Sequence, residues 1–92
     1  MKNSIVDEVR ASKELARILE EVCGIQASDI QKSLFGEPYR LTAENCVYVL
    51  FELSRVLCFN IEIDLVNEMN DFSFSDIVKA ISGLPLNAND EN

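Results

Sequence analysis

Few side chains in this chain could do covalent chemistry. It has no histidine, and its three cysteines, Cys23, Cys46 and Cys58, are widely spaced among aliphatic neighbours. A nucleophilic or redox-active cysteine usually needs a histidine or another cysteine nearby, so we interpret these thiols as small buried apolar side chains in a reducing compartment. A zinc site without histidine would need carboxylates to complete it, and we predict neither a metal site nor a cofactor.

The carboxylates lack the arrangement of an acid–base site. Glu20, Glu21, Glu44, Glu52 and Asp76 are spaced like solvated surface charge, and no glycine-rich phosphate loop or nucleophile–base pair accompanies them. We therefore expect a protein that is not an enzyme. The formal net charge of −8 repels phosphate backbones and anionic lipid headgroups, so the expected partner is a protein rather than nucleic acid or a membrane.

The length of the chain suits a single domain. Its 92 residues, of which 48% are hydrophobic, are enough for one core without disulfide or metal staples. We expect this domain to span 1–85 and the polar, acidic stretch 86–92 to be a disordered tail. The beginning of the chain does not resemble a signal peptide, and the longest apolar run, 46–51, is too short to cross a bilayer. A cytoplasmic protein is predicted.

The elements that must position these side chains are helices. Apolar spacing predicts a long first helix over about 5–23, with Ser4 as its N-cap and Gly24 at its C-terminal end. A long loop over 25–41 follows. Loops of this length in small domains are usually functional, and its apolar residues should pin it to the core.

Three further helices are predicted after the loop. Thr42 is the expected N-cap of a second long helix over about 43–59. A short third helix covers about 65–69. A fourth begins after Ser73, where Asp76 suggests an approximate capping box, and it ends before Gly83. On a helical wheel the second helix is apolar or small over roughly 220°, wider than the stripe of an ordinary surface helix.

The segment 41–81 resembles acyl carrier proteins without a gap. Leu41-Thr-Ala-Glu-Asn-Cys46 aligns with the Leu-Gly-x-Asp-Ser-Leu attachment motif of that family, and Phe59-Asn-Ile-Glu-Ile63 resembles its Phe-x-x-Glu-Ile. Ser73-Phe-Ser-Asp-Ile-Val-Lys-Ala-Ile81 resembles the family's last helix. The resemblance implies an all-α fold: a four-helix acyl-carrier-like bundle of long, long, short and medium helices, with a long loop between the first and second.

The phosphopantetheine attachment position of that motif is vacant. Asn45 stands where the family has the serine that attacks coenzyme A, and an amide is not a nucleophile. Three other hydroxyls are fallback candidates. Thr42 is expected to be occupied as the N-cap, Ser33 lies about a dozen residues too early, and Ser54 is expected to face the core. Cys46 aligns with the family's leucine and is interpreted as an apolar contact.

The second helix also departs from the family's recognition face. The resemblance implies acidic residues that meet basic patches on partner enzymes, but several matching positions here are apolar. A partner using this face would be bound more by apolar burial than by charge. The alternative is that these residues are simply core. The candidate partner-binding residues are Cys46, Val49, Leu50, Leu53, Val56 and Leu57.

Two local motifs narrow the resemblance. Leu34-Phe-Gly-Glu-Pro-Tyr39 and Val47-Tyr-Val-Leu-Phe-Glu52 are similar to those of acyl carrier-related proteins encoded with bacterial peptide-maturation systems of bacteriocin type. This implies a docking or accessory module whose partner is a biosynthetic or peptide-modifying enzyme. Two alternatives stay open: a functional acyl or peptidyl carrier modified at a displaced hydroxyl, and a small helical structural protein that forms a homodimer.

Overall fold

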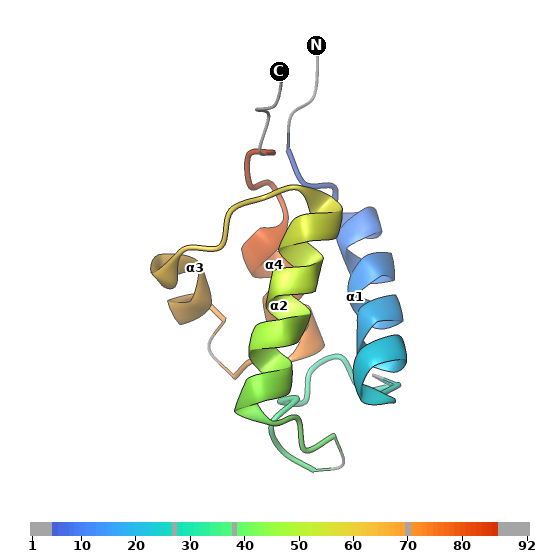
Figure 1. Cartoon of the computed structure of the whole chain (residues 1–92). Coiled ribbons are helices and arrows are strands. Elements are labelled where there is room, and N and C mark those ends of the chain that lie inside the picture. Colours follow the sequence, from blue (N-terminus) through green and yellow to red (C-terminus); the bar gives the residue numbers. More distant parts are fainter. Residues whose placement is uncertain (1–4, 27, 38, 70, 87–92) are drawn as a thin grey trace.

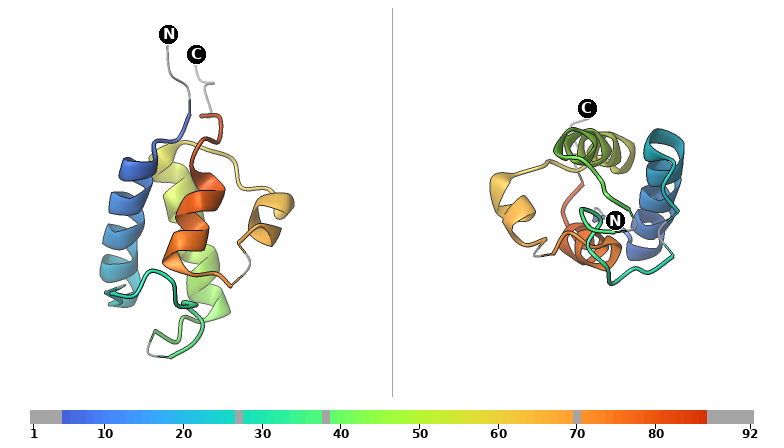
Figure 2. Two further views of the ribbon diagram at one scale, coloured as in Figure 1. Left: turned by 180° about the vertical axis from the view of Figure 1, so that it is seen from behind. Right: turned by 90° about the horizontal axis from the view of Figure 1, so that it is seen from below.

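The computed structural model describes residues 5–26, 28–37, 39–69 and 71–86. Within them lie the helices α1 (Glu8–Cys23), α2 (Ala43–Leu57), α3 (Ile63–Asn67) and α4 (Phe74–Ile81). Figure 1 shows α1 and α2 side by side with α4 behind them. Seen from below in Figure 2, α3 lies on the side of the molecule opposite α1. The described chain is thus all-α, with long, long, short and medium helices in the predicted order.

The first helix begins later than the sequence suggested. It starts at Glu8 rather than near Ile5, because Asp7 is the N-cap and its carboxylate accepts a hydrogen bond from the Arg10 N–H at 2.9 Å. Ile5 instead forms a β-bridge with Pro85. The predicted cap, Ser4, lies outside the described residues. Pairing with a segment far along the chain therefore replaces the first predicted helical turn.

The end of α1 is as predicted. Gly24 adopts φ +67°, which carries little cost for a residue without a Cβ. Its N–H donates to the Glu20 carbonyl at 3.0 Å, and the N–H of Ile25 donates to the Leu19 carbonyl at 3.1 Å. These two bonds close the last turn of the helix and direct the chain into the long loop.

The start of α2 is confirmed, and its end is corrected. The Thr42 hydroxyl accepts from the Asn45 N–H at 3.1 Å, so Thr42 is the N-cap. The helix ends at Leu57 rather than at Phe59, because Cys58 adopts a left-handed conformation with φ +61°. That turn places Phe59 in the core, where it is 3% exposed.

The third helix lies two residues earlier than predicted, over Ile63–Asn67, and its N-cap Glu62 makes no side-chain capping bond. The start of α4 is confirmed, since the Ser73 hydroxyl accepts from the Asp76 N–H at 3.0 Å. The reciprocal half of the predicted capping box is replaced by another contact. The Asp76 carboxylate accepts from the Asp71 N–H at 3.1 Å and so braces the link between α3 and α4.

The long loop is fastened to the α4 side of the bundle. Leu34 is fully buried, and its N–H donates to the Phe72 carbonyl at 3.0 Å. The N–H of Ser75, in the first turn of α4, donates to the Ile30 carbonyl at 2.9 Å. The ring of Phe35 stacks on that of Phe72. As expected, the apolar residues of the loop hold it to the rest of the fold.

The core lies between α1, α2 and α4, and each helix buries one face. Leu86, in the predicted tail, packs partly against this core, while 87–92 lie outside the described residues. None of the helices described is both long enough and apolar enough to cross a membrane. The buried helix residues are Ala11, Leu15, Ile18 and Leu19 of α1, Val49, Leu50, Leu53 and Leu57 of α2, and Phe74, Ile77, Val78 and Ile81 of α4.

Candidate functional site

Asn45, which the resemblance aligns with the family's attachment serine, lies in the first turn of α2. The backbone N–H of Asn45 donates to the Thr42 hydroxyl, and the Asn45 side chain is half-buried. Cys46 is also half-buried, and burial raises the pKa of its thiol. A raised pKa lowers the fraction of Cys46 that is thiolate, so this thiol is not activated. The amide of Asn45 is not a nucleophile either, so the position offers no good nucleophile.

The three fallback hydroxyls are each engaged in a local hydrogen bond. Thr42 caps α2, Ser33 accepts from the Phe35 N–H at 3.3 Å, and Ser54 donates to the Phe51 carbonyl at 2.7 Å. Ser33 and Ser54 are also half-buried. Nine residues along a helix correspond to about 13 Å, so Ser54 lies far from Asn45. Of the three, Thr42 is hydrogen-bonded to Asn45 itself.

Four of the six predicted partner-binding residues lie in the core, which is the alternative that the sequence left open for them. These four side chains belong to the buried core cluster, which also contains residues of α1 and α4. Cys46 and Val56 are half-buried. The exposed fractions are 0% for Val49 and Leu53, 2% for Leu57 and 5% for Leu50. Of the two readings of the apolar arc, the structure supports core for these four residues.

Other apolar residues of α2 face the solvent. Val47 is 66% exposed and Phe51 is 69% exposed, and they lie one turn apart on the same side of the helix. Sequence reasoning missed them because it treated the apolar arc as uniform. The available signal was their place on the wheel, at the edge of the arc and next to the exposed Glu44.

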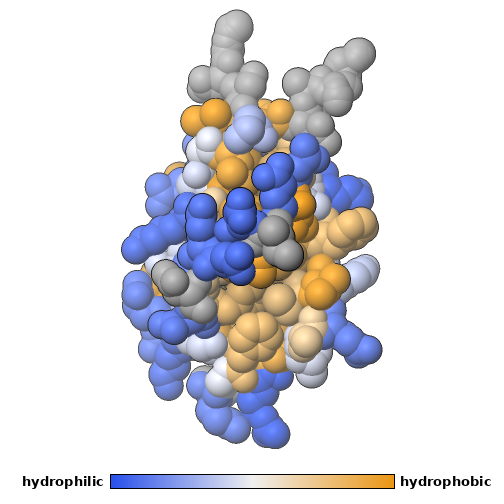
Figure 3. Space-filling model, turned by 90° about the vertical axis from the view of Figure 1, so that its left-hand side faces the viewer, coloured by the Kyte–Doolittle hydropathy of each residue, from blue (hydrophilic) through white to orange (hydrophobic). Residues whose placement is uncertain are grey.

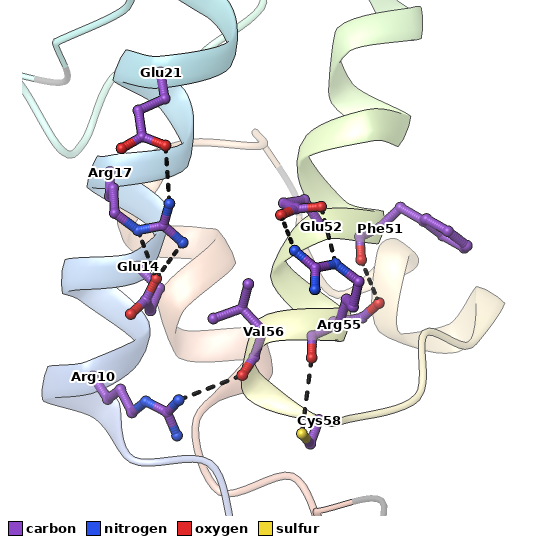
Figure 4. A network of polar contacts seen from close by, with 10 residues as sticks. Arg10, Glu14, Arg17, Glu21, Phe51, Glu52, Arg55, Val56 and Cys58 are labelled. Carbon is purple, nitrogen blue, oxygen red and sulfur yellow. Dashed lines mark hydrogen bonds and ion pairs between the residues drawn. The ribbon is translucent and has the colours of Figure 1, made fainter.

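The α1 side of α2 is polar. Arg17 of α1 pairs with Glu14 at 2.6 Å and with Glu21 at 3.0 Å, and the Arg10 guanidinium donates to the Val56 carbonyl at 3.4 Å, as Figure 4 shows. Glu52 of α2 is bonded to Arg55 of the same helix. Phe51 points away from α1 in the same view. Val47 and Phe51 therefore belong to the opposite side of α2, which faces α3.

A third exposed apolar residue, Phe35, adds to this side. Phe35 is 47% exposed and stacks on Phe72, which belongs to the link between α3 and α4. Figure 3 shows a broad apolar area on the side of the molecule where α3 lies, with hydrophilic side chains above and below it. We call the exposed side chains of Phe35, Val47 and Phe51 the apolar face.

Hollows are also present outside the apolar face. One of about 470 Å³ is lined by residues 5–8, Ser82 and Gly83. A hollow of about 110 Å³ lies between α1 and α4, where Glu8, Phe74 and Lys79 are among its lining residues. Another of about 150 Å³ is lined in part by Leu65 and Leu84. Within the described ranges, no three cysteine, aspartate or glutamate side chains are grouped so that they could hold a metal ion. We take the apolar face as the candidate site because Val47 and Phe51 are more exposed than any other large apolar side chain of the described residues.

Comparison of the chain with protein-family models, with curated protein sequences and with solved structures gave no match. The acyl-carrier resemblance therefore stays an expectation based on the motifs and on the order of the helices.

Proposed function

We propose that this protein is an acyl-carrier-like module that carries no prosthetic group and acts by binding another protein, as a docking or accessory subunit of a biosynthetic or peptide-modifying enzyme. One observation carries the proposal. The residue in the first turn of α2, at the attachment position of the family's motif, is Asn45, and its amide cannot form the phosphodiester that a serine hydroxyl forms. The attachment chemistry is therefore lost at that position.

The hydroxyl nearest to that position already has a structural role. Thr42 caps α2 through its contact with the Asn45 N–H, and capping residues of this kind contribute about 1 kcal/mol to helix stability. Modification of Thr42 would have to proceed beside that contact, one turn before the position at which the family's serine is recognised. This favours the non-carrying role over a displaced carrier.

The exposed residues of α2 support the binding role. Val47 and Phe51 project into solvent from the middle of a helix whose opposite face is fully buried. Complete burial of such side chains against a partner contributes about 1.5–3 kcal/mol each, before the cost of association is subtracted. Two or three anchors of this size suit a reversible contact with a partner enzyme.

The test is a reaction with coenzyme A and a broadly specific phosphopantetheinyl transferase, followed by intact-mass measurement. A known acyl carrier protein in the same reaction shows that the transferase is active. The natural protein is expected to keep its mass, because it offers no hydroxyl at the attachment position. Asn45→Ser supplies that hydroxyl and measures whether the surrounding surface is still recognised.

Thr42→Asp separates the displaced-carrier alternative from the proposal. Aspartate is a good N-cap, so this variant keeps the fold and removes the hydroxyl. A gain of one phosphopantetheine by the natural protein that disappears in Thr42→Asp would establish a carrier modified at Thr42. If Thr42→Asp still gains one phosphopantetheine, another hydroxyl, such as that of Ser33 or Ser54, is modified. This result would also contradict the proposal.

A further inference from the structure

The charged residues in the segment beside the apolar face are all acidic. From 56 to 78, which includes α3 and both of its connections, there is no lysine or arginine, but there are five carboxylates. α3 and the residues next to it expose four of these, and they line the same side of the molecule as Val47 and Phe51. The five are Glu62, Asp64, Glu68, Asp71 and Asp76, of which the first four are exposed.

The arrangement in space follows the sequence. In Figure 3, which views the side of the molecule where α3 lies, hydrophilic side chains lie over α3 and the apolar area lies directly beneath them. Glu44 adds an exposed carboxylate on α2, one turn before Val47. The apolar face is thus an uncharged centre with an acidic border.

Among the described residues, no lysine or arginine forms an ion pair with a carboxylate of this border. Arg17 is paired with Glu14 and Glu21 on α1, Arg40 with Glu37 in the loop, and Arg55 with Glu52 on α2. These arginines are engaged by acidic neighbours in their own segments. The negative potential around α3 is therefore available to a partner.

A second copy of the chain fits this surface poorly. A two-fold dimer brings the same patch of both subunits together, so the carboxylates of one α3 would approach those of the other. Like charges that are brought together at an interface disfavour association. Each copy also carries a net charge of −8, which adds a general repulsion.

We infer that the apolar face binds an amphipathic segment of a partner protein, with large apolar side chains against Phe35, Val47 and Phe51 and with lysine or arginine against the carboxylates around α3. This rests on the proposed binding role and states the chemistry of the partner. The apolar anchors give the contact its affinity. The charges set its orientation and its rate of association, and they make binding weaken as salt rises.

The test uses the full chain and two designed probes: a helical peptide of leucine and lysine, and a matched peptide in which glutamate replaces lysine. Backbone amide shifts locate the bound peptide, and titrations give its affinity. We expect the cationic peptide to bind, to shift amides of α2 and α3 around Val47 and Phe51, and to lose affinity with added salt. The glutamate peptide should bind at least tenfold more weakly.

A matched pair of variants localises the contact. Val47 and Val9 are both exposed valines on helices, at 66% and 62%, but Val9 lies on α1, outside the apolar face. Val47→Ser is expected to lower the affinity for the cationic peptide about fivefold, whereas Val9→Ser should leave that affinity unchanged. A fivefold loss is about 1 kcal/mol. Because both positions are exposed, neither substitution threatens the fold.

Three results would overturn the inference. One is equal affinity for the two peptides, and another is an equal loss of affinity in Val9→Ser and Val47→Ser. The third is a dimer in sedimentation that Val47→Ser dissociates, which would assign the face to a second copy. Each of these outcomes leaves the non-carrying role to be decided by the mass measurement, so the two proposals fail separately.

Discussion

The ring of Phe35 stacks on the ring of Phe72, with centroids 4.9 Å apart and planes inclined by 23°. This contact joins the long loop to the link between α3 and α4. Phe72 has a backbone φ of +54°, which is costly for a bulky side chain. A residue keeps such a conformation when its surroundings fix it firmly, and here the Leu34 N–H bonds to the Phe72 carbonyl on one side while the Phe35 ring covers the side chain.

The two rings should contribute unequally to stability. Phe72 is 5% exposed and Phe35 is 47% exposed, so Phe72→Ala should lower the free energy of unfolding by about 3 kcal/mol. Phe35→Ala removes mainly the aromatic pair and should cost about 1 kcal/mol. Urea denaturation of both variants measures the difference. Equal costs would mean that Phe72 stabilises the fold only through its contact with the Phe35 ring, and that its burial in the core adds nothing.

Two glycines form a second test, of the end of α1. Gly24 has φ +67° with no atom within 4 Å of an added Cβ, and Gly36 lacks a positive φ. Gly24→Ala should therefore destabilise the protein by about 1 kcal/mol through the backbone alone. Gly36→Ala, whose Cβ would make ordinary contact, should change stability little. Thermal unfolding of both proteins checks this, and a larger loss at Gly36 would contradict the described loop.

The N-cap of α2 can be tested by a pair of substitutions at one position. Thr42→Ala removes the acceptor of the Asn45 N–H and should lower the free energy of unfolding by about 1 kcal/mol. Thr42→Asp supplies another acceptor and a negative charge at the N-terminus of the helix, so it should keep the stability of the natural protein. Denaturant midpoints distinguish the two. If Thr42→Asp were as unstable as Thr42→Ala, loss of the N-cap hydrogen bond would not explain the destabilisation of Thr42→Ala.

Acid should remove one surface contribution to stability. The hydrogen bond from Arg55 is the main cause that lowers the pKa of Glu52 below its ordinary value of 4.5, with a smaller effect of Arg17. A depressed pKa stabilises the folded state above the unfolded pKa, and that stabilisation is lost as pH falls through the folded pKa. Glu52→Gln should therefore be less stable than the natural protein at neutral pH and equal to it in strong acid.

The Arg55→Met background controls that comparison. Without its main partner, the carboxylate of Glu52 has less to gain from ionisation, so Glu52→Gln should then have a much smaller pH-dependent effect. An unchanged pH dependence in this background would assign the effect to another group. Unfolding free energies measured from neutral pH into acid are sufficient for both comparisons.

Local signals predicted the parts of the fold that local contacts determine. The caps Thr42 and Ser73 and the terminal glycine Gly24 are where the sequence placed them, because each acts within a few residues of itself. The start of α1 could not be predicted in the same way. It depends on the pairing of Ile5 with Pro85, eighty residues further along the chain.

The candidate site was predicted less well than the fold, for a physical reason. Periodicity shows that α2 has a wide apolar arc, but which part of the arc is covered depends on the neighbouring helices. Val49 and Leu53 are fully buried in a core to which α1 and α4 also contribute, while α3 is five residues long and Val47 and Phe51 stay exposed. The residues of α2 alone therefore cannot show which part of its apolar arc is buried.

The mass of the natural protein decides whether it binds its partner without carrying a prosthetic group. The chain is isolated from the cells that produce it, under conditions that preserve phosphodiesters, and its intact mass is compared with that of the sequence. We expect no phosphopantetheine adduct, because Asn45 offers no hydroxyl for attachment. A protein that carries the pantetheine thiol, on any residue, would contradict the account.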